Sequence, residues 1–179
     1  MIIIQIIIII ILTFVAFWQF CLIYAQILGA PTVYANKKAI LDACRLAGLK
    51  KGQTIIDLGC GDGRSLILAA REFKAKGIGI ERSPYCYLKS KFNVLLSRQK
   101  DIKILFGDIG KFRDEIEKAD VVYVYLLNSV LAQIEDWLFK SKKPETKIVS
   151  LAFKFKKHDP KKLATTTNLG RETTLRLYI

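Results

Sequence analysis

Charged side chains are absent from the first fifth of the chain. Residues 1–36 contain no Lys, Arg, Asp, Glu or His, so all 29 basic and 16 acidic side chains lie in residues 37–179. The net charge of +13 is therefore concentrated in one region, which is large enough for a single folded domain. An apolar segment precedes that basic domain.

Histidine and paired cysteines are also scarce. His158 is the only histidine, which excludes a histidine-rich metal site. The cysteines are scattered, with no CxxC pair and no metal-ligand spacing: Cys21, Cys44, Cys60 and Cys86. We expect reduced thiols, as in a reducing compartment, and no bound metal.

The uncharged N-terminal segment is long enough to cross a bilayer. It is apolar from Ile2 to Ile27 with few polar interruptions, and about 20 apolar residues cross the hydrocarbon core. The alternative is a cleaved signal peptide, which would have a basic n-region and a shorter apolar stretch. We therefore expect a transmembrane anchor over residues 1–28, followed by a domain over residues 29–179.

The orientation of this anchor follows from the charges beside it. Only Met1 precedes the apolar run, whereas basic residues follow it closely: Lys37, Lys38, Arg45, Lys50 and Lys51. Basic residues that flank a membrane span stay on the cytoplasmic side. We expect a single-pass protein whose domain lies at the cytoplasmic face of the membrane.

Strand-like and helix-like segments alternate through the domain. Short apolar runs, typical of buried strands, lie at residues 53–59, 77–81, 102–108, 120–126 and 146–153. Segments with helical spacing lie at residues 36–48, 64–73, 83–99, 111–118 and 129–140. Two β-like runs around Asn168-Leu169-Gly170 predict a C-terminal hairpin. This order predicts an α/β fold with a mostly parallel sheet, helices on both faces and an antiparallel strand from the hairpin.

The stretch TIIDLGCGDGRS, residues 54–65, ends the first predicted strand in a glycine-rich turn. A P-loop requires GxxxxGK[ST], which neither the glycine spacing nor Arg64-Ser65 provides. A dinucleotide fingerprint requires a third glycine where Arg64 stands. Asp57 would also repel a pyrophosphate, whereas it favours a cationic ligand.

The spacing D-x-G-x-G-x-G resembles motif I of the class I S-adenosylmethionine-dependent methyltransferases, and it is formed by Asp57, Gly59, Gly61 and Gly63. The resemblance implies a Rossmann-like class I methyltransferase sheet and S-adenosyl-L-methionine as the cofactor. It implies that the glycine turn packs against the methionine moiety, with Cys60 as a small residue inside the turn. It also implies that Asp57 orients the amino group of the cofactor.

Two more acids follow the next two predicted strands. Glu81 stands where the family has the carboxylate that binds both ribose hydroxyls. Asp108 stands where the family's acid holds the adenine amino group, and Ile109 would line the adenine ring. Each of the three acids has a plainer alternative, which is to cap the turn or helix that follows it.

Residues 31–81 carry a narrower resemblance. Together with the apolar segment, they are similar to the small membrane-anchored lysine methyltransferases related to the mitochondrial ATP synthase c-subunit lysine methyltransferase. That family shows P-[YF]-V-P before the first helix, whereas this chain has Pro31-Thr32-Val33-Tyr34. The resemblance implies that this stretch borders the acceptor site. It also implies a lysine acceptor on a membrane-associated protein rather than a nucleic acid.

The acceptor side is less well marked. Tyr125 and Asn128 stand where class I enzymes present groups to the methyl acceptor, and ordinary strand packing for Tyr125 and a helix cap at Asn128 are the plainer alternative. The N/D-P-P-Y/F motif of the amide- and adenine-methylating branch is absent. Two other functions stay open. One is methylation of a lipid-soluble small molecule such as a quinone, and the other is a non-catalytic module that binds the cofactor or a membrane partner.

A lysine-rich segment lies near the C-terminus. Residues 140–162 hold nine lysines against Glu145 and Asp159. A solvated surface and attraction to an anionic membrane leaflet both account for such a segment. No RNA-binding module is recognisable in it.

Overall fold

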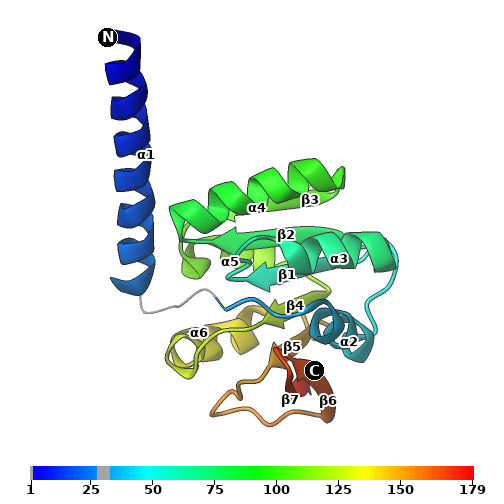
Figure 1. Cartoon of the computed structure of the whole chain (residues 1–179). Coiled ribbons are helices and arrows are strands. Elements are labelled where there is room, and N and C mark those ends of the chain that lie inside the picture. The colour runs from blue at the N-terminus through cyan, green and yellow to red at the C-terminus, as the bar shows by residue number, and fades with distance from the viewer. Residues whose placement is uncertain (1, 28–32) are drawn as a thin grey trace.

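Seven strands form one sheet in the computed structural model, which describes residues 2–27 and 33–179 (Figure 1). The strand order is β3-β2-β1-β4-β5-β7-β6. The strands are β1 Thr54–Leu58, β2 Lys76–Glu81, β3 Ile102–Phe106, β4 Val121–Val124, β5 Lys147–Leu151, β6 Lys162–Asn168 and β7 Arg171–Tyr178. Strands β1 to β5 pair in parallel, whereas β7 is antiparallel to both β5 and β6. The expected parallel sheet with an antiparallel C-terminal hairpin is confirmed.

Helices cover both faces of this sheet. The helices of the chain are α1 Ile2–Ile27, α2 Lys37–Ala47, α3 Arg64–Phe73, α4 Pro84–Ser97, the 3-10 helix η1 Ile109–Phe112, α5 Arg113–Glu117 and α6 Asn128–Ser141, and all but α1 lie against the sheet. Apolar residues of α2 and α3 join one face of the sheet in a buried cluster, and α4 lies beside α3. Apolar residues of α5 and α6 form a second buried cluster with the other face.

Local sequence signals set several of these bounds. The Asn36 side chain accepts the Ala39 N–H at 2.8 Å where α2 begins, and Gly48 ends that helix with a φ of 63°. The hairpin turn between β6 and β7 consists of Leu169 and Gly170, whose φ angles of 51° and 77° are both left-handed. Two-residue turns of this kind match the twist of the strands that they join.

Three strands end two residues before the apolar runs that predict them. Their last residues are Phe106, Val124 and Leu151. The last ladder pairs join Glu81 to Phe106 and Val124 to Ser150. The residues that follow β3 and β4 leave the sheet and line a cavity at its carboxyl edge. Apolarity alone does not reveal where this pairing stops, because apolar residues such as Leu126 and Phe153 continue beyond the last ladder pairs.

Helix α1 contacts the domain at α4. The rings of Trp18 and Tyr85 meet edge to face, with centroids 4.6 Å apart. Residues Ile2–Cys21 are long and apolar enough to cross a bilayer, by length and composition. Figure 1 shows the N-terminal half of α1 extending beyond the domain. The expected domain boundary near residue 28 lies outside the described residues.

Candidate active site

A cavity of about 350 Å³ lies at the carboxyl ends of the central strands. The chain runs outward from β1 to β2 and β3, and then crosses to the other side of β1 to form β4. Ligands of open α/β sheets bind at such a switch point. The cavity has the size of a small-molecule site. The sequence-predicted residues that line it are Asp57, Gly59, Cys60, Gly61, Glu81, Asp108, Ile109 and Tyr125.

The glycine turn brings backbone close to this cavity. Gly59, Gly61 and Gly63 all have left-handed φ angles, of 82°, 56° and 78°. A Cβ atom on Gly59 would lie 2.9 Å from Cδ2 of Leu126, so only glycine fits there without a shift. The Gly59 and Cys60 N–H groups donate to the Ile80 carbonyl at 2.9 and 3.1 Å, which fixes the turn on β2.

Gly63 has a different position from the other two glycines. It does not line the cavity and instead precedes the first residue of α3. A Cβ atom there would lie 3.3 Å from the Cβ of Ser90. Gly63 therefore allows α4 to pack closely against the turn, and the Asn93 side-chain amide donates to the Asp62 carbonyl at 2.9 Å in the same region.

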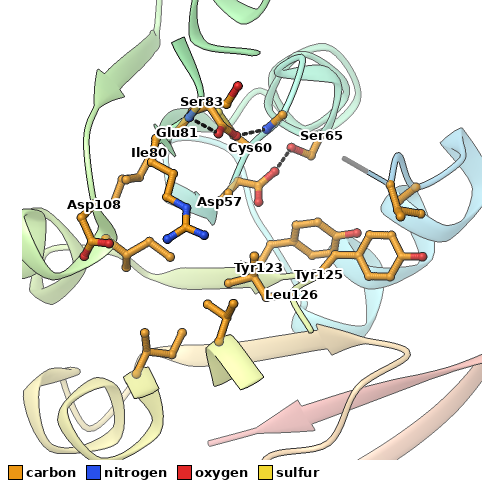
Figure 2. Close-up of a pocket in the computed structure, with 18 of the residues that line it drawn as sticks. Asp57, Cys60, Ser65, Ile80, Glu81, Ser83, Asp108, Tyr123, Tyr125 and Leu126 are labelled. Atoms are coloured by element: carbon orange, nitrogen blue, oxygen red, sulfur yellow. Dashed lines mark hydrogen bonds between the residues drawn. The ribbon is translucent and has the colours of Figure 1, made fainter. Parts of the chain in front are cut away.

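Two buried carboxyl groups face the cavity, from β1 and β2 (Figure 2). The Ser65 hydroxyl donates to Asp57, while Glu81 accepts the Gly61 and Ser83 N–H groups, each at 2.8 Å. The pKa of Asp57 is raised to about 7, mainly because the carboxyl is buried; the Ser65 hydrogen bond lowers it, and the nearby Glu81 and Asp62 carboxyls raise it. Burial also raises the pKa of Glu81. A cationic ligand would relieve the cost of ionising both groups.

Tyr123, on β4, was not among the predicted site residues. Its side chain is buried, and its hydroxyl has no hydrogen-bond partner among the described residues. Burial, followed by the nearby Asp57 carboxyl, raises the pKa of Tyr123 well above its ordinary value. A buried hydroxyl without a partner costs free energy unless a ligand satisfies it. The signal in the sequence is the spacing of Tyr123 and Tyr125, which places both side chains on one face of a strand.

Asp108 lies at the rim of the cavity, on the far side from the two tyrosines (Figure 2). It is exposed, and its carboxylate accepts the Gly110 N–H at 2.9 Å, where η1 begins. The capping alternative therefore holds for Asp108, and the residue also borders the cavity next to Ile109.

The opposite wall is aromatic and is built from distant segments. Tyr125 accepts a hydrogen bond from the side-chain amide of Asn168 at 3.2 Å, and its ring lies 6.1 Å from that of Phe153. The side-chain oxygen Oδ1 of Asn168 accepts the Asn36 N–H at 2.9 Å, so the hairpin is tied to the segment before α2. Tyr34, from that segment, also lines the cavity. No pattern in the sequence indicates that Asn168 would contact Tyr125.

Two features that were predicted for the acceptor site do not fully belong to this wall. Asn128 is exposed as the first residue of α6, and it lines a separate depression with Phe153 and Arg176. It does not border the cavity that contains Asp57. Of the Pro31–Tyr34 stretch, Val33 and Tyr34 border the cavity, whereas residues 31 and 32 lie outside the described residues.

Arg64 joins the glycine turn to the segment before α2. Its guanidinium pairs with the Asp62 carboxylate at 2.7 Å and lies 4.4 Å from the centre of the Tyr34 ring. It also donates to the Ala35 carbonyl at 3.4 Å. Arg64 therefore positions Tyr34 over the cavity.

The chain is similar to known proteins over most of its length. Residues 57–162 match the family described as the ANTKMT methyltransferase domain. A protein-lysine N-methyltransferase of Saccharolobus islandicus (strain REY15A) is 30% identical over 154 residues, which cover 83% of this chain and 92% of that protein.

Solved structures extend the comparison. An RNA methyltransferase from Salinibacter ruber, in complex with S-adenosyl-L-homocysteine, has a TM-score of 0.73 and 31% sequence identity, over 80% of this chain and 92% of that one. The precorrin-6y C5,15-methyltransferase from Geobacter metallireducens GS-15 has a TM-score of 0.66 at 14% identity, over 78% of this chain and 86% of that one. The second likeness shows the fold alone.

The family match spans more than half of the chain, and the ligand of the Salinibacter ruber protein is the demethylated form of S-adenosylmethionine. The expected Rossmann-like class I methyltransferase fold and the expected cofactor are confirmed. The chain belongs to the ANTKMT methyltransferase domain family and is an S-adenosylmethionine-dependent methyltransferase.

Proposed function

We propose that this methyltransferase modifies lysine side chains of a membrane-associated protein. The observation that carries the proposal is the likeness to a protein-lysine N-methyltransferase across 92% of that protein. The aromatic wall opposite the two buried carboxyl groups supports it, because a lysine amine must lose its proton before it can accept a methyl group. Aromatic surroundings lower the pKa of an amine by removing water from it.

The residues of the cavity fit S-adenosylmethionine, because buried acids and an unpartnered hydroxyl suit a cation that carries an amino acid moiety. We assign the methionine amino group to Asp57, and the methionine moiety to the glycine turn with Cys60. The Tyr123 hydroxyl would form a hydrogen bond with this moiety. Glu81 would hold the ribose hydroxyls, and Asp108 with Ile109 would hold the adenine.

When bound, the cofactor supplies an electrophilic methyl group on a sulfonium sulfur, and the electron pair of the breaking S–C bond stays on that sulfur. The chain has to hold the acceptor amine in line and keep water out. Tyr125 accepts a hydrogen bond from Asn168, so its own O–H and a remaining lone pair are available to orient the amine. The proton of the lysine ammonium leaves to solvent before attack. Proximity and orientation supply roughly 7–11 kcal/mol in well-aligned reactions.

We also propose that α1 anchors the enzyme, with the domain at the cytoplasmic face of the membrane. The length and composition of Ile2–Cys21 support the anchor, and the basic residues that follow it support the orientation. Alkaline extraction should leave the full chain in the membrane pellet. Protease added to sealed, inside-out vesicles should digest the domain.

RNA is the second candidate acceptor, because the Salinibacter ruber protein of similar identity is described as an RNA methyltransferase. The two acceptors are distinguished by incubating the full chain with membranes, total RNA and S-adenosylmethionine labelled in the methyl group. We expect label in protein, released as methyl-lysine on hydrolysis, and none with Asp57→Ala. Label that is removed by ribonuclease or by lipid extraction would overturn the lysine assignment.

A further inference from the structure

Helix α4 exposes its large apolar side chains instead of burying them against the domain. The residues that it buries are small or polar: Cys86, Ser90 and Ser97. Its exposed apolar residues are Leu88, Phe92, Leu95 and Leu96, between 53% and 74% exposed. Their spacing of four, three and one residues places them on one side of a helix. A surface helix of a water-soluble domain shows the reverse arrangement, so this apolar stripe requires a partner.

The contact with α1 shows where the stripe leads. Tyr85, three residues before Leu88 on α4, packs against Trp18 of α1. Trp18 lies in the C-terminal half of α1, which is helical from Ile2 to Ile27. The N-terminal end of α4 therefore lies beside the C-terminal half of the proposed span, the half nearer to the domain.

Charge next to the stripe has one sign. The charged residues between positions 82 and 100 are all basic: Arg82, Lys89, Lys91, Arg98 and Lys100. Lys89 lies 5.9 Å from the Tyr85 ring, and Lys91 lies 5.6 Å from the Tyr87 ring. Basic residues beside an apolar helical face are the signature of a helix that lies in the interface of an anionic bilayer.

The lysine-rich segment at residues 140–162 has another environment. It leads to β6, at the opposite edge of the sheet from β3 and α4 (Figure 1). Two of its lysines are paired, Lys154 with Asp159 at 2.9 Å and Lys157 with Asp136 at 2.6 Å. The apolar stripe and α1 thus mark the α4 edge, and not the lysine-rich edge, as the one that faces lipid.

We infer that the exposed face of α4 inserts into the headgroup region of an anionic bilayer next to α1, so that the domain is held against the membrane at two places. The inference rests on the proposed anchoring by α1. Phe106 of β3, which is also exposed and lies 5.1 Å from the Tyr87 ring between centroids, extends the same surface. Two attachment points fix the orientation of the domain, whereas α1 alone would let it rotate.

Tryptophan reporters test this placement in the full chain, reconstituted into phosphatidylcholine–phosphatidylglycerol vesicles with acyl chains brominated near the headgroups. Leu95→Trp places the reporter on the stripe, at a side chain that is 74% exposed. Leu163→Trp is the matched control on β6, at a side chain that is 64% exposed. The fluorescence of Trp18 is obtained as the difference between the unsubstituted chain and Trp18→Phe. Binding of S-adenosylmethionine checks that each variant is folded.

We expect the Leu95→Trp reporter to lose most of its fluorescence in brominated vesicles, and to lose less when the vesicles lack phosphatidylglycerol. The Leu163→Trp reporter should stay unquenched. Quenching of Trp18 with no quenching at position 95 would overturn the inference and leave the anchor in place. Quenching at neither position would overturn both. Protection of position 95 from aqueous acrylamide without bromolipid quenching would mean that a second copy covers the stripe, which also overturns the inference.

Discussion

The two walls of the cavity differ in how the chain builds them. The wall with Asp57, Glu81 and Asp108 comes from the ends of three neighbouring strands, within about fifty consecutive residues. The aromatic wall brings together Tyr34 and Tyr125, and Asn168 and Phe153 contact Tyr125 from outside the cavity. Figure 2 shows Asp108 and the tyrosines on opposite sides of the space between them. The first wall is local in sequence, and the second exists only after the whole sheet has formed.

This difference predicts that substitutions in the two walls change different constants. Substitutions in the carboxylate wall should weaken cofactor binding, whereas substitutions in the aromatic wall should lower kcat and leave the Kd for the cofactor unchanged. Each prediction below tests one side of that division.

Asp57→Asn should have the largest effect. The substitution keeps the shape of the side chain and removes its charge, and a hydrogen bond to a charged group is worth about 1.5–3 kcal/mol. Titration calorimetry should therefore show a Kd for S-adenosylmethionine that is about 10- to 150-fold higher. The free protein should be no less stable at pH 7, because burial makes ionised Asp57 unfavourable before the cofactor binds.

Asp120→Asn is the matched control for that variant. Asp120 accepts the Thr54 N–H at 2.7 Å at the other end of β1, and its loss should lower stability without changing the Kd. An equal loss of affinity in both variants would show that the effect of Asp57 is structural.

The next largest effect should be the change of the Kd for S-adenosylmethionine with pH. The pKa of Asp57 is raised to about 7 in the free protein, so a bound cation must displace a proton below that pH. The Kd should rise about tenfold for each pH unit below 7, because one proton is linked to binding. Asp57→Asn should abolish this slope. A slope that persists in the variant would assign the proton to another group, such as Glu81.

The same shift predicts the stability of the free protein. Between about pH 4 and pH 7, folded Asp57 keeps a proton that the unfolded chain releases, so the free energy of unfolding falls as the pH rises. Saturating cofactor should abolish this trend, because Asp57 is then ionised in both the folded and the unfolded state, as measured by thermal melts at several pH values.

Tyr125→Phe should have a smaller effect, on the other wall. Loss of the hydroxyl removes the group that accepts the Asn168 amide and orients the acceptor amine, so kcat should fall by up to about tenfold. The Kd for S-adenosylmethionine should not change. Tyr87→Phe, outside the cavity on α4, is the control and should leave both constants unaltered. A Kd that rises with Tyr125→Phe would contradict the division between the two walls.

Asp108→Asn should have the smallest effect. Asp108 is exposed, so solvent screens its charge, and asparagine preserves the cap on Gly110. A change of only a few-fold in the Kd is expected by calorimetry. A change as large as that of Asp57→Asn would mean that Asp108 becomes buried when the cofactor binds.

Much of the fold could be predicted from residues 36–178. Strand and helix periodicity, the Asn36 cap and the Leu169-Gly170 turn all act over a few residues, and each is confirmed in the structure. The glycine turn is local too, since three left-handed residues before α3 require glycine wherever the rest of the chain goes.

Other features could not be predicted because they depend on partners far along the chain. Tyr123 and Asp57 lie side by side on one face of the sheet because β1 pairs with β4, and the register makes these two residues partners. Asn128 was expected at the acceptor site, but the structure places it in a neighbouring depression because β4 ends at Val124 and the chain turns before α6.

The sequence by itself determined the elements, the apolar N-terminal helix and the glycine turn, because each of these depends on interactions between near neighbours. Only the tertiary structure decided which tyrosine hydroxyl is buried without a partner, which distant segments form the aromatic wall, and which face of α4 is left uncovered. These depend on strand order and helix packing, where free energies of contact between distant residues outweigh local preference.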